Sequence, residues 1–157
     1  MKIVSTDSKS GKEVVTDIAD PNPSFFTFIQ DINLTDAQVR VQIDAMSISA
    51  DIKAMLYSFS KTTIKAGRVI LKIGKKILDI LFSLLRAFPN ITFGIIFGLI
   101  VGALVASIPV LGVAIGSLAT TIAVAFGFVM GAKGDLASGE MGKRVDIVLA
   151  QFAPLRT

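Results

Sequence analysis

Residues 88–132 read FPNITFGIIFGLIVGALVASIPVLGVAIGSLATTIAVAFGFVMGA and contain no charged side chain. A helix that crosses a bilayer needs about 20 apolar residues, so this stretch is long enough for two spans and a turn. Ser107, Pro109 and Gly112 form the only internal cluster of turn-forming residues. The stretch therefore predicts a transmembrane helical hairpin over residues 89–132.

The position of the turn, at residues 107–112, divides the hairpin into two spans. Ile91–Ile108 is the first predicted span and Val110–Gly131 is the second. Basic residues flank the hairpin on both sides, whereas the turn carries no charge. The positive-inside rule then places both termini in the cytoplasm or an equivalent interior. We expect an integral protein of a bacterial inner membrane or a virion membrane.

Small residues recur at intervals of four in both spans. This spacing puts them on one helix face, where another backbone can approach closely. The face could pack within the hairpin or between subunits, and both uses stay open at this point. The predicted packing and oligomerisation positions are Gly94, Gly98, Gly102, Ala106, Gly112, Gly116, Gly127 and Gly131.

Residues 61–88, directly before the hairpin, are strongly basic. Their polar side chains follow one another mostly at steps of three and four, which predicts a long amphipathic helix. A soluble helix with a solvated basic face is one interpretation. We favour a helix in the membrane interface with its cations on anionic lipid headgroups. The predicted headgroup contacts are Lys61, Lys65, Arg68, Lys72, Lys75, Lys76 and Arg86.

Residues 1–60 are polar and net acidic, and we predict a small, mainly helical cytoplasmic region. Thr35 and Gln38 have the spacing of a capping box, which predicts a helix from about Asp36 to Ser58. Two segments near the N-terminus also fit short strands. These segments are Lys2–Ser5 and Glu13–Ile18.

Residues 133–157 form the predicted C-terminal tail. Within it, Glu140–Phe152 fits a short helix with one apolar side, and Pro154 would end that helix.

The composition excludes several classes of chemistry. The chain has 157 residues, of which 52% are hydrophobic and 18% charged, and it contains neither cysteine nor histidine. No nucleotide-binding motif or positioned catalytic pair is present, so we expect no enzyme, cofactor or metal site. The net charge of +4 comes from the basic segment beside the hairpin. That segment has a simpler use at a membrane than on nucleic acid, which we do not expect as a partner.

The uncharged hairpin with its nonpolar tip resembles the hydrophobic hairpin of pore-forming colicins, and its glycine spacing is similar to that of glycine-zipper membrane proteins. The resemblance covers residues 88–132 alone, and the larger helical colicin domain does not fit in 157 residues. It implies membrane insertion and a pore, and it transfers no binding or catalytic residue.

These observations predict an all-α membrane protein. A small N-terminal region and a long basic amphipathic helix would precede a transmembrane helical hairpin. The leading functional hypothesis is self-association through the glycine faces into a membrane assembly such as a pore or permeabilising complex. One alternative is a membrane-anchored adaptor that binds a protein through residues 1–60, or a structural subunit of a virion or secretion machine. A holin-like lysis protein is a further alternative. Anionic lipids and further copies of the chain are the expected partners.

Overall fold

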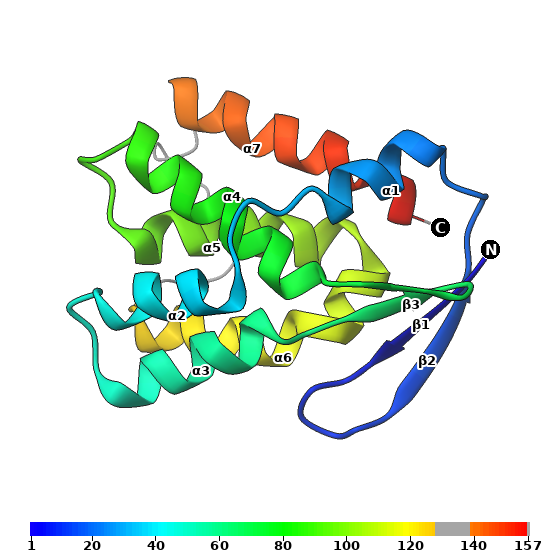
Figure 1. Ribbon diagram of the computed structural model, residues 1–157, viewed down its shortest axis with the longest axis horizontal. Coiled ribbons are helices and arrows are strands. Elements are labelled where there is room, and N and C mark those ends of the chain that lie inside the picture. The colour runs from blue at the N-terminus through cyan, green and yellow to red at the C-terminus, as the bar shows by residue number, and fades with distance from the viewer. Residues whose placement is uncertain (128–138, 157) are drawn as a thin grey trace.

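The computed structural model describes residues 1–127 and 139–156. It is a mixed α/β fold, in which a small sheet lies beside the N-terminus at one end of a group of helices (Figure 1). The strands are β1 (Lys2–Thr6), β2 (Glu13–Asp17), β3 (Ile64–Ala66) and β4 (Val69–Leu71). The helices are α1 (Pro23–Gln30), α2 (Asp36–Asp44), α3 (Ala50–Ser60), α4 (Ile73–Ala87), α5 (Phe93–Ser107), α6 (Pro109–Ala125) and α7 (Gly139–Phe152), followed by the 3-10 helix η2 (Ala153–Leu155).

Helix α5 is the centre of the fold. α4, α6 and α7 all pack against it, while α3 packs against α4 and α6. Consecutive side chains from Ile96 to Leu104 are buried, so every face of α5 is covered. A helix that is apolar on all faces belongs either in a membrane or in a protein core. In this chain it forms the core.

The predicted transmembrane hairpin is wrong. α5 has 15 residues and α6 has 17, against about 20 for a membrane span. No helix within 1–127 and 139–156 is both long and apolar enough to cross a bilayer. The expected integral location in a bacterial inner membrane or virion membrane, with both termini inside, is overturned by the same finding. The end of the second predicted span, including Gly131, lies outside the described residues.

The all-α prediction is also wrong, because four strands form an antiparallel sheet in the order β2-β1-β3-β4. β1 is an inner strand and α6 packs on it. Its inward side chains, Ile3 and Ser5, are buried. The two short N-terminal strands predicted from the sequence are confirmed as β1 and β2.

The long basic helix over residues 61–88 is wrong in its first half, where β3 and β4 form a hairpin. Gly67 has a φ of +59°, while no described residue other than glycine has a positive φ. Gly67 is therefore the first of two turn residues in a type II′ turn, a type that favours hairpins. β-Branched residues such as Ile64, Val69 and Ile70 further favour strands. Only Ile73–Ala87 is helical, as α4.

The predicted helix over 36–58 is two helices. Its capping box is confirmed, since Thr35 accepts from the Gln38 N–H and the Gln38 side chain accepts from the Thr35 N–H. α2 nevertheless ends at Asp44. Ser49 then caps α3 by accepting a hydrogen bond from the Ile52 N–H at 3.3 Å.

The predicted C-terminal helix is confirmed as α7. Its apolar side, which includes Val145 and Val148, is buried. The Phe152 ring meets the Phe28 ring edge-on at 5.4 Å between centroids, which joins α7 to α1.

Candidate functional site

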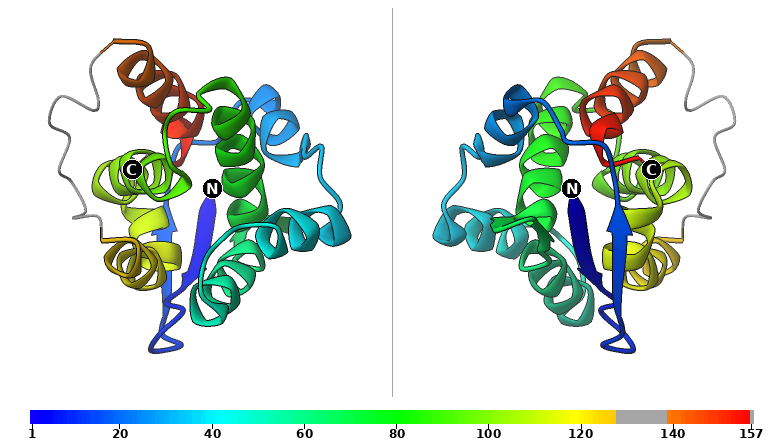
Figure 2. Two further views of the ribbon diagram at one scale, coloured as in Figure 1. Left: turned by 90° about the vertical axis from the view of Figure 1, so that its left-hand side faces the viewer. Right: turned by 90° about the vertical axis from the view of Figure 1, so that its right-hand side faces the viewer.

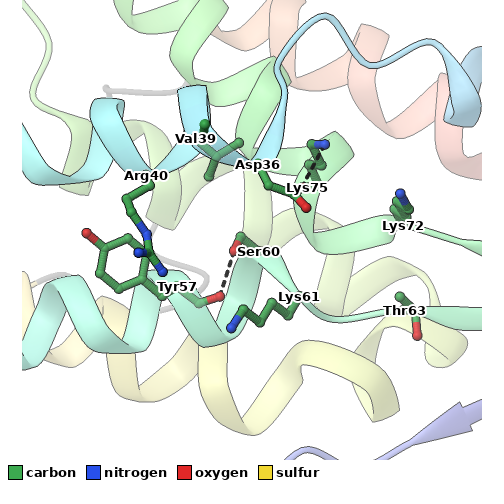
Figure 3. A pocket seen from close by; sticks show the side chains of 10 residues that line it. Asp36, Val39, Arg40, Tyr57, Ser60, Lys61, Thr63, Lys72 and Lys75 are labelled. Atoms are coloured by element: carbon green, nitrogen blue, oxygen red, sulfur yellow. Dashed lines mark hydrogen bonds and ion pairs between the residues drawn. The ribbon is translucent and has the colours of Figure 1, made fainter.

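A cleft of about 410 Å³ lies between α2 and α3, beside the first turn of α4 (Figure 3). Basic and hydroxyl-bearing side chains are prominent in its lining. The lining residues are Asp36, Ala37, Val39, Arg40, Tyr57, Ser60, Lys61, Thr63, Lys72 and Lys75.

Local structure brings four cations to this cleft from three helices. Asp36 and Arg40 lie one turn apart on α2, so both side chains project from one face. Lys61 is the C-cap of α3. Lys72 is the N-cap of α4, and Lys75 lies in the first turn of that helix.

Asp36 is the only acidic residue among those that line the cleft, and one of the lysines neutralises it. The Lys75 Nζ lies 2.9 Å from Asp36 Oδ1. That hydrogen bond and the Lys75 charge hold the pKa of Asp36 below its ordinary value, and the charges of Lys72 and Lys61 add to the effect. Three cations, Arg40, Lys61 and Lys72, remain without a carboxylate partner among the lining residues.

The pKa of Asp36 gives a direct check of this arrangement. We expect Lys75→Met to raise that pKa toward its ordinary value, because the largest cause of its depression is removed. A carbon-detected NMR titration of the Asp36 carboxyl group in both proteins would measure the change. The Asp36 charge contributes stability above the unfolded-state pKa, and this contribution is lost as the pH falls through the folded-state pKa. An unchanged titration curve in Lys75→Met would contradict the ion pair.

Arg40 is held over α3 by an aromatic contact. Its guanidinium carbon lies 5.5 Å from the centroid of the Tyr57 ring. The Tyr57 hydroxyl donates a hydrogen bond to the Asp44 carboxylate, and this bond raises the pKa of Tyr57. Arg40 lies against the Tyr57 ring as a cation–π partner.

The N-terminus of α4 adds to the positive potential of the cleft. No side chain caps the first turn of α4. The N-terminus of a helix carries a partial positive charge. Gly74 donates its N–H to the Thr62 carbonyl at 3.0 Å, which holds this end of α4 against the chain that follows α3.

The structure separates the seven basic residues that were predicted to contact lipid headgroups. Lys61, Lys72 and Lys75 meet in the cleft, whereas Lys65 and Arg68 lie on the β3–β4 hairpin and Arg86 is exposed at the end of α4. Lys76 is only 6% exposed.

Lys76 is instead a buried structural cation. Its Nζ donates to the Asp31 carbonyl at 2.6 Å and lies 4.5 Å from the centroid of the Phe28 ring. Burial lowers the pKa of Lys76, and the charge of Asp79 opposes this effect.

Sequence reasoning missed Arg40. The capping box marks the start of α2, and Arg40 lies four residues after Asp36 on that helix. This spacing places both side chains on one helix face and was the available signal. Nothing in the sequence shows that α2 folds back beside Lys61 and Lys72.

The predicted hairpin turn lies where the structure ends α5 at Ser107 and begins α6 at Pro109. Gly112 and Gly116 face α5 across this turn. A Cβ on Gly112 would lie 3.3 Å from the Val105 carbonyl oxygen, and one on Gly116 would lie 3.6 Å from Val105 Cγ1. These two glycines therefore allow α6 to pack closely against α5.

The remaining small residues differ in their surroundings. Gly94 lies under the Phe126 ring, since a Cβ there would come within 2.9 Å of it. Gly98 and Gly102 are buried in α5, and Ala106 is exposed. Gly127 has a φ of +77° after the end of α6. Self-association through these positions stays a prediction.

Among the residues that the structure places, no three His, Cys, Asp or Glu side chains are grouped to hold a metal ion. The basic cleft is therefore the best-defined candidate site in the described part of the chain. No family model matches this chain, and no curated protein or solved structure matches it significantly.

Proposed function

We propose that this chain is a binding protein whose basic cleft takes a phosphate-bearing ligand. One observation carries the proposal: four cations from α2, α3 and α4 converge on one cleft that has a single carboxylate, already paired with Lys75. Like charges repel, so a bound anion would reduce the electrostatic repulsion among these cations.

The chemistry of the lining favours phosphate over a simple carboxylate. Arg40 offers a planar fork of donors that matches phosphate oxygens, and Lys61 and Lys72 offer compact charges. Thr63 lines the same cleft with a hydroxyl group, whereas the Ser60 hydroxyl donates to the Tyr57 carbonyl at 2.6 Å. A volume of about 410 Å³ accommodates more than one phosphate group and lies in the range of small-molecule sites.

We propose binding rather than catalysis because Asp36 is poorly suited to transfer a proton. Lys75 holds its pKa below the ordinary value, so it stays ionised at ordinary pH. The ligand could be a soluble phosphate compound or the headgroup of an anionic lipid. Both sources present the same oxygen atoms to the cleft.

A binding experiment tests the site and distinguishes the two sources. Inorganic pyrophosphate would be titrated calorimetrically into the protein, and vesicles of phosphatidylcholine with or without phosphatidylglycerol would be used in sedimentation assays. We expect Lys61→Gln/Lys72→Gln to weaken binding at least tenfold, on the order of 1.4 kcal/mol, because two charge-assisted contacts are lost. Pyrophosphate binding would indicate a soluble ligand. Binding to the anionic vesicles alone would indicate a headgroup.

The matched control is Lys65→Gln/Arg86→Gln, which removes the same charge from exposed positions outside the cleft lining. We expect this variant to bind like the wild type. Equal weakening by both double variants would show a response to net charge alone. That result, or no binding of either probe to the wild type, would refute the proposed site.

A further inference from the structure

β2 forms one edge of the sheet, and part of its backbone has no hydrogen-bond partner among the described residues. The Ile18 N–H donates to the Met1 carbonyl at 2.9 Å, which makes these two residues a hydrogen-bonded pair at the end of the β1–β2 ladder. Hydrogen-bonded and non-bonded pairs alternate along antiparallel strands. The N–H and C=O groups of Glu13, Val15 and Asp17 therefore point away from β1.

β4 forms the opposite edge. Ala66 and Val69 flank the two-residue turn and are opposite each other, so they form the hydrogen-bonded pair next to it. Ile70, opposite Lys65, is then a non-bonded position whose N–H and C=O point away from β3. A hollow of about 350 Å³, lined partly by Ile70 and Ile32, leaves space beside this edge.

The two edges present matching apolar side chains on the same face of the sheet. Val15 lies opposite Val4, Val4 opposite Lys65, and Lys65 opposite Ile70. Directly opposed residues share a face, so Val15 and Ile70 both lie on the outer face. Val15 is 58% exposed and Ile70 is 63% exposed.

We propose that β4 of one copy of this chain pairs antiparallel with β2 of a second copy, with Ile70 opposite Val15. Both residues direct their backbone groups outward, so the pair can exchange two hydrogen bonds as in a continuous sheet. The Ile70 and Val15 side chains then cover each other on the outer face. The β4–β2 contact is argued from the sheet edges and not from the anion site, although Lys72 also lines the basic cleft.

Charge complementarity selects this partner and this register. With Ile70 opposite Val15, continuing the register brings Arg68 of the β3–β4 turn beside Asp17, and Lys72, the N-cap of α4, beside Glu13. Opposite charges at facing positions stabilise a strand pair, and like charges destabilise it. Pairing of β2 with a second β2 about Val15 would place Glu13 opposite Asp17. The acidic β2 edge therefore fits the basic β4 edge and repels another copy of itself.

The contact uses two different surfaces and so can repeat from copy to copy. Neighbouring strands alternate in direction along β2-β1-β3-β4, so β2 and β4 run in opposite directions within one copy. An antiparallel β4–β2 contact then keeps all copies in the same orientation. Such a heterologous contact forms rings or open chains. The right-hand view in Figure 2 shows β1 and β2 at the end of the molecule that faces the viewer.

Charge exchange across the contact tests the proposal in the full-length protein. Asp17→Arg and Arg68→Asp would each be followed by sedimentation velocity over a range of protein concentrations at low and high salt. The wild type is expected to form species that grow beyond dimers with concentration and dissociate at high salt. Each single variant places like charges at the contact and should stay monomeric at concentrations at least tenfold higher.

The double variant Asp17→Arg/Arg68→Asp restores opposite charges and should associate like the wild type. An equimolar mixture of the two single variants should also associate, because each supplies the edge that fits the other. Val15→Pro is a second variant that should prevent the β4–β2 contact. Proline removes an outward N–H on an edge strand without breaking the β1–β2 ladder. Circular dichroism would verify that each variant is folded.

Three results would overturn the proposal. The first is a wild type that stays monomeric at every concentration. The second is a double variant that remains monomeric although it is folded. The third is association that persists unchanged in both single variants, which would indicate another surface such as the glycine positions of α5 and α6.

Discussion

Gly74→Ala is expected to destabilise the protein by about 3 kcal/mol, a large part of the stability of an ordinary domain. A Cβ at position 74 would lie 1.8 Å from the carbonyl oxygen of Phe59 and 2.9 Å from its carbonyl carbon. These are backbone atoms of α3, so they cannot rotate away as a side chain can. Relief requires α3 and α4 to move apart, which opens the core between them. Urea unfolding followed by circular dichroism would measure the loss.

Gly116→Ala is the matched control because it makes the same chemical change in another helix. Its Cβ would meet Val105 Cγ1 at 3.6 Å, which is an ordinary van der Waals contact. Alanine has the higher helix propensity, so the substitution should be neutral or stabilise by up to about 1 kcal/mol. If both variants lost the same stability, the close α3–α4 approach at Gly74 would be contradicted.

Phe97→Ala is expected to cost about 3–5 kcal/mol, because it removes a fully buried aromatic side chain and leaves a cavity. Phe97 is 0% exposed. Its ring lies 5.4 Å from that of Phe59 on α3, 6.1 Å from that of Phe93 and 6.5 Å from that of Phe126, between centroids. The measurement is again the free energy of unfolding in urea.

Val124→Ala provides the comparison, since Val124 is 67% exposed on α6. A change at such a position normally alters stability by less than about 0.5 kcal/mol. The contrast tests whether α5 is the protein core, as the structure has it. Equal effects at Phe97 and Val124 would contradict that placement.

Local signals in the sequence predicted local structure well. Thr35 and Gln38 marked the start of α2 because a capping box depends only on neighbouring side chains and N–H groups. The α7 helix and the two N-terminal strands were likewise recognisable from their own residues. These features need no knowledge of what packs against them.

Residues 61–72 were misassigned because the same residues fit two periodicities. Basic side chains at steps of three and four suit one helix face. They also suit a hairpin in which Lys65 points outward and the turn carries Arg68. Gly67 decides between the two, since it can adopt the positive φ of the type II′ turn without strain.

The larger error concerned α5, and its cause is physical. Hydropathy measures how poorly a segment is solvated by water, and it does not show whether lipid or protein covers the segment. The cover over α5 comes from its two neighbours in the chain, α4 and α6, and from the later helix α7. Among the properties of α5 itself, only its length of 15 residues distinguishes a core helix from a membrane-spanning helix. The ends of a helix, and so its length, are the least reliable part of a helix prediction.

Only some of the residues that line the candidate cleft could be predicted from the sequence. Lys61, Lys72 and Lys75 belonged to the predicted basic set, but the expected straight helix spread them along one line. The cleft exists because α2 packs beside α3 and α4, which places Arg40 and Asp36 near these lysines. Such a grouping is a property of tertiary packing.

The burial of α5 has a consequence for synthesis of the chain. The ribosome releases α5 before α7, the helix that closes over it. At roughly 5–20 residues per second, α7 follows only after a delay of a few seconds. During that interval α5, the most apolar of the described helices, lacks one of its covering surfaces. Transiently exposed apolar surface makes a chain prone to aggregate, so we expect the nascent protein to be most vulnerable before α7 docks.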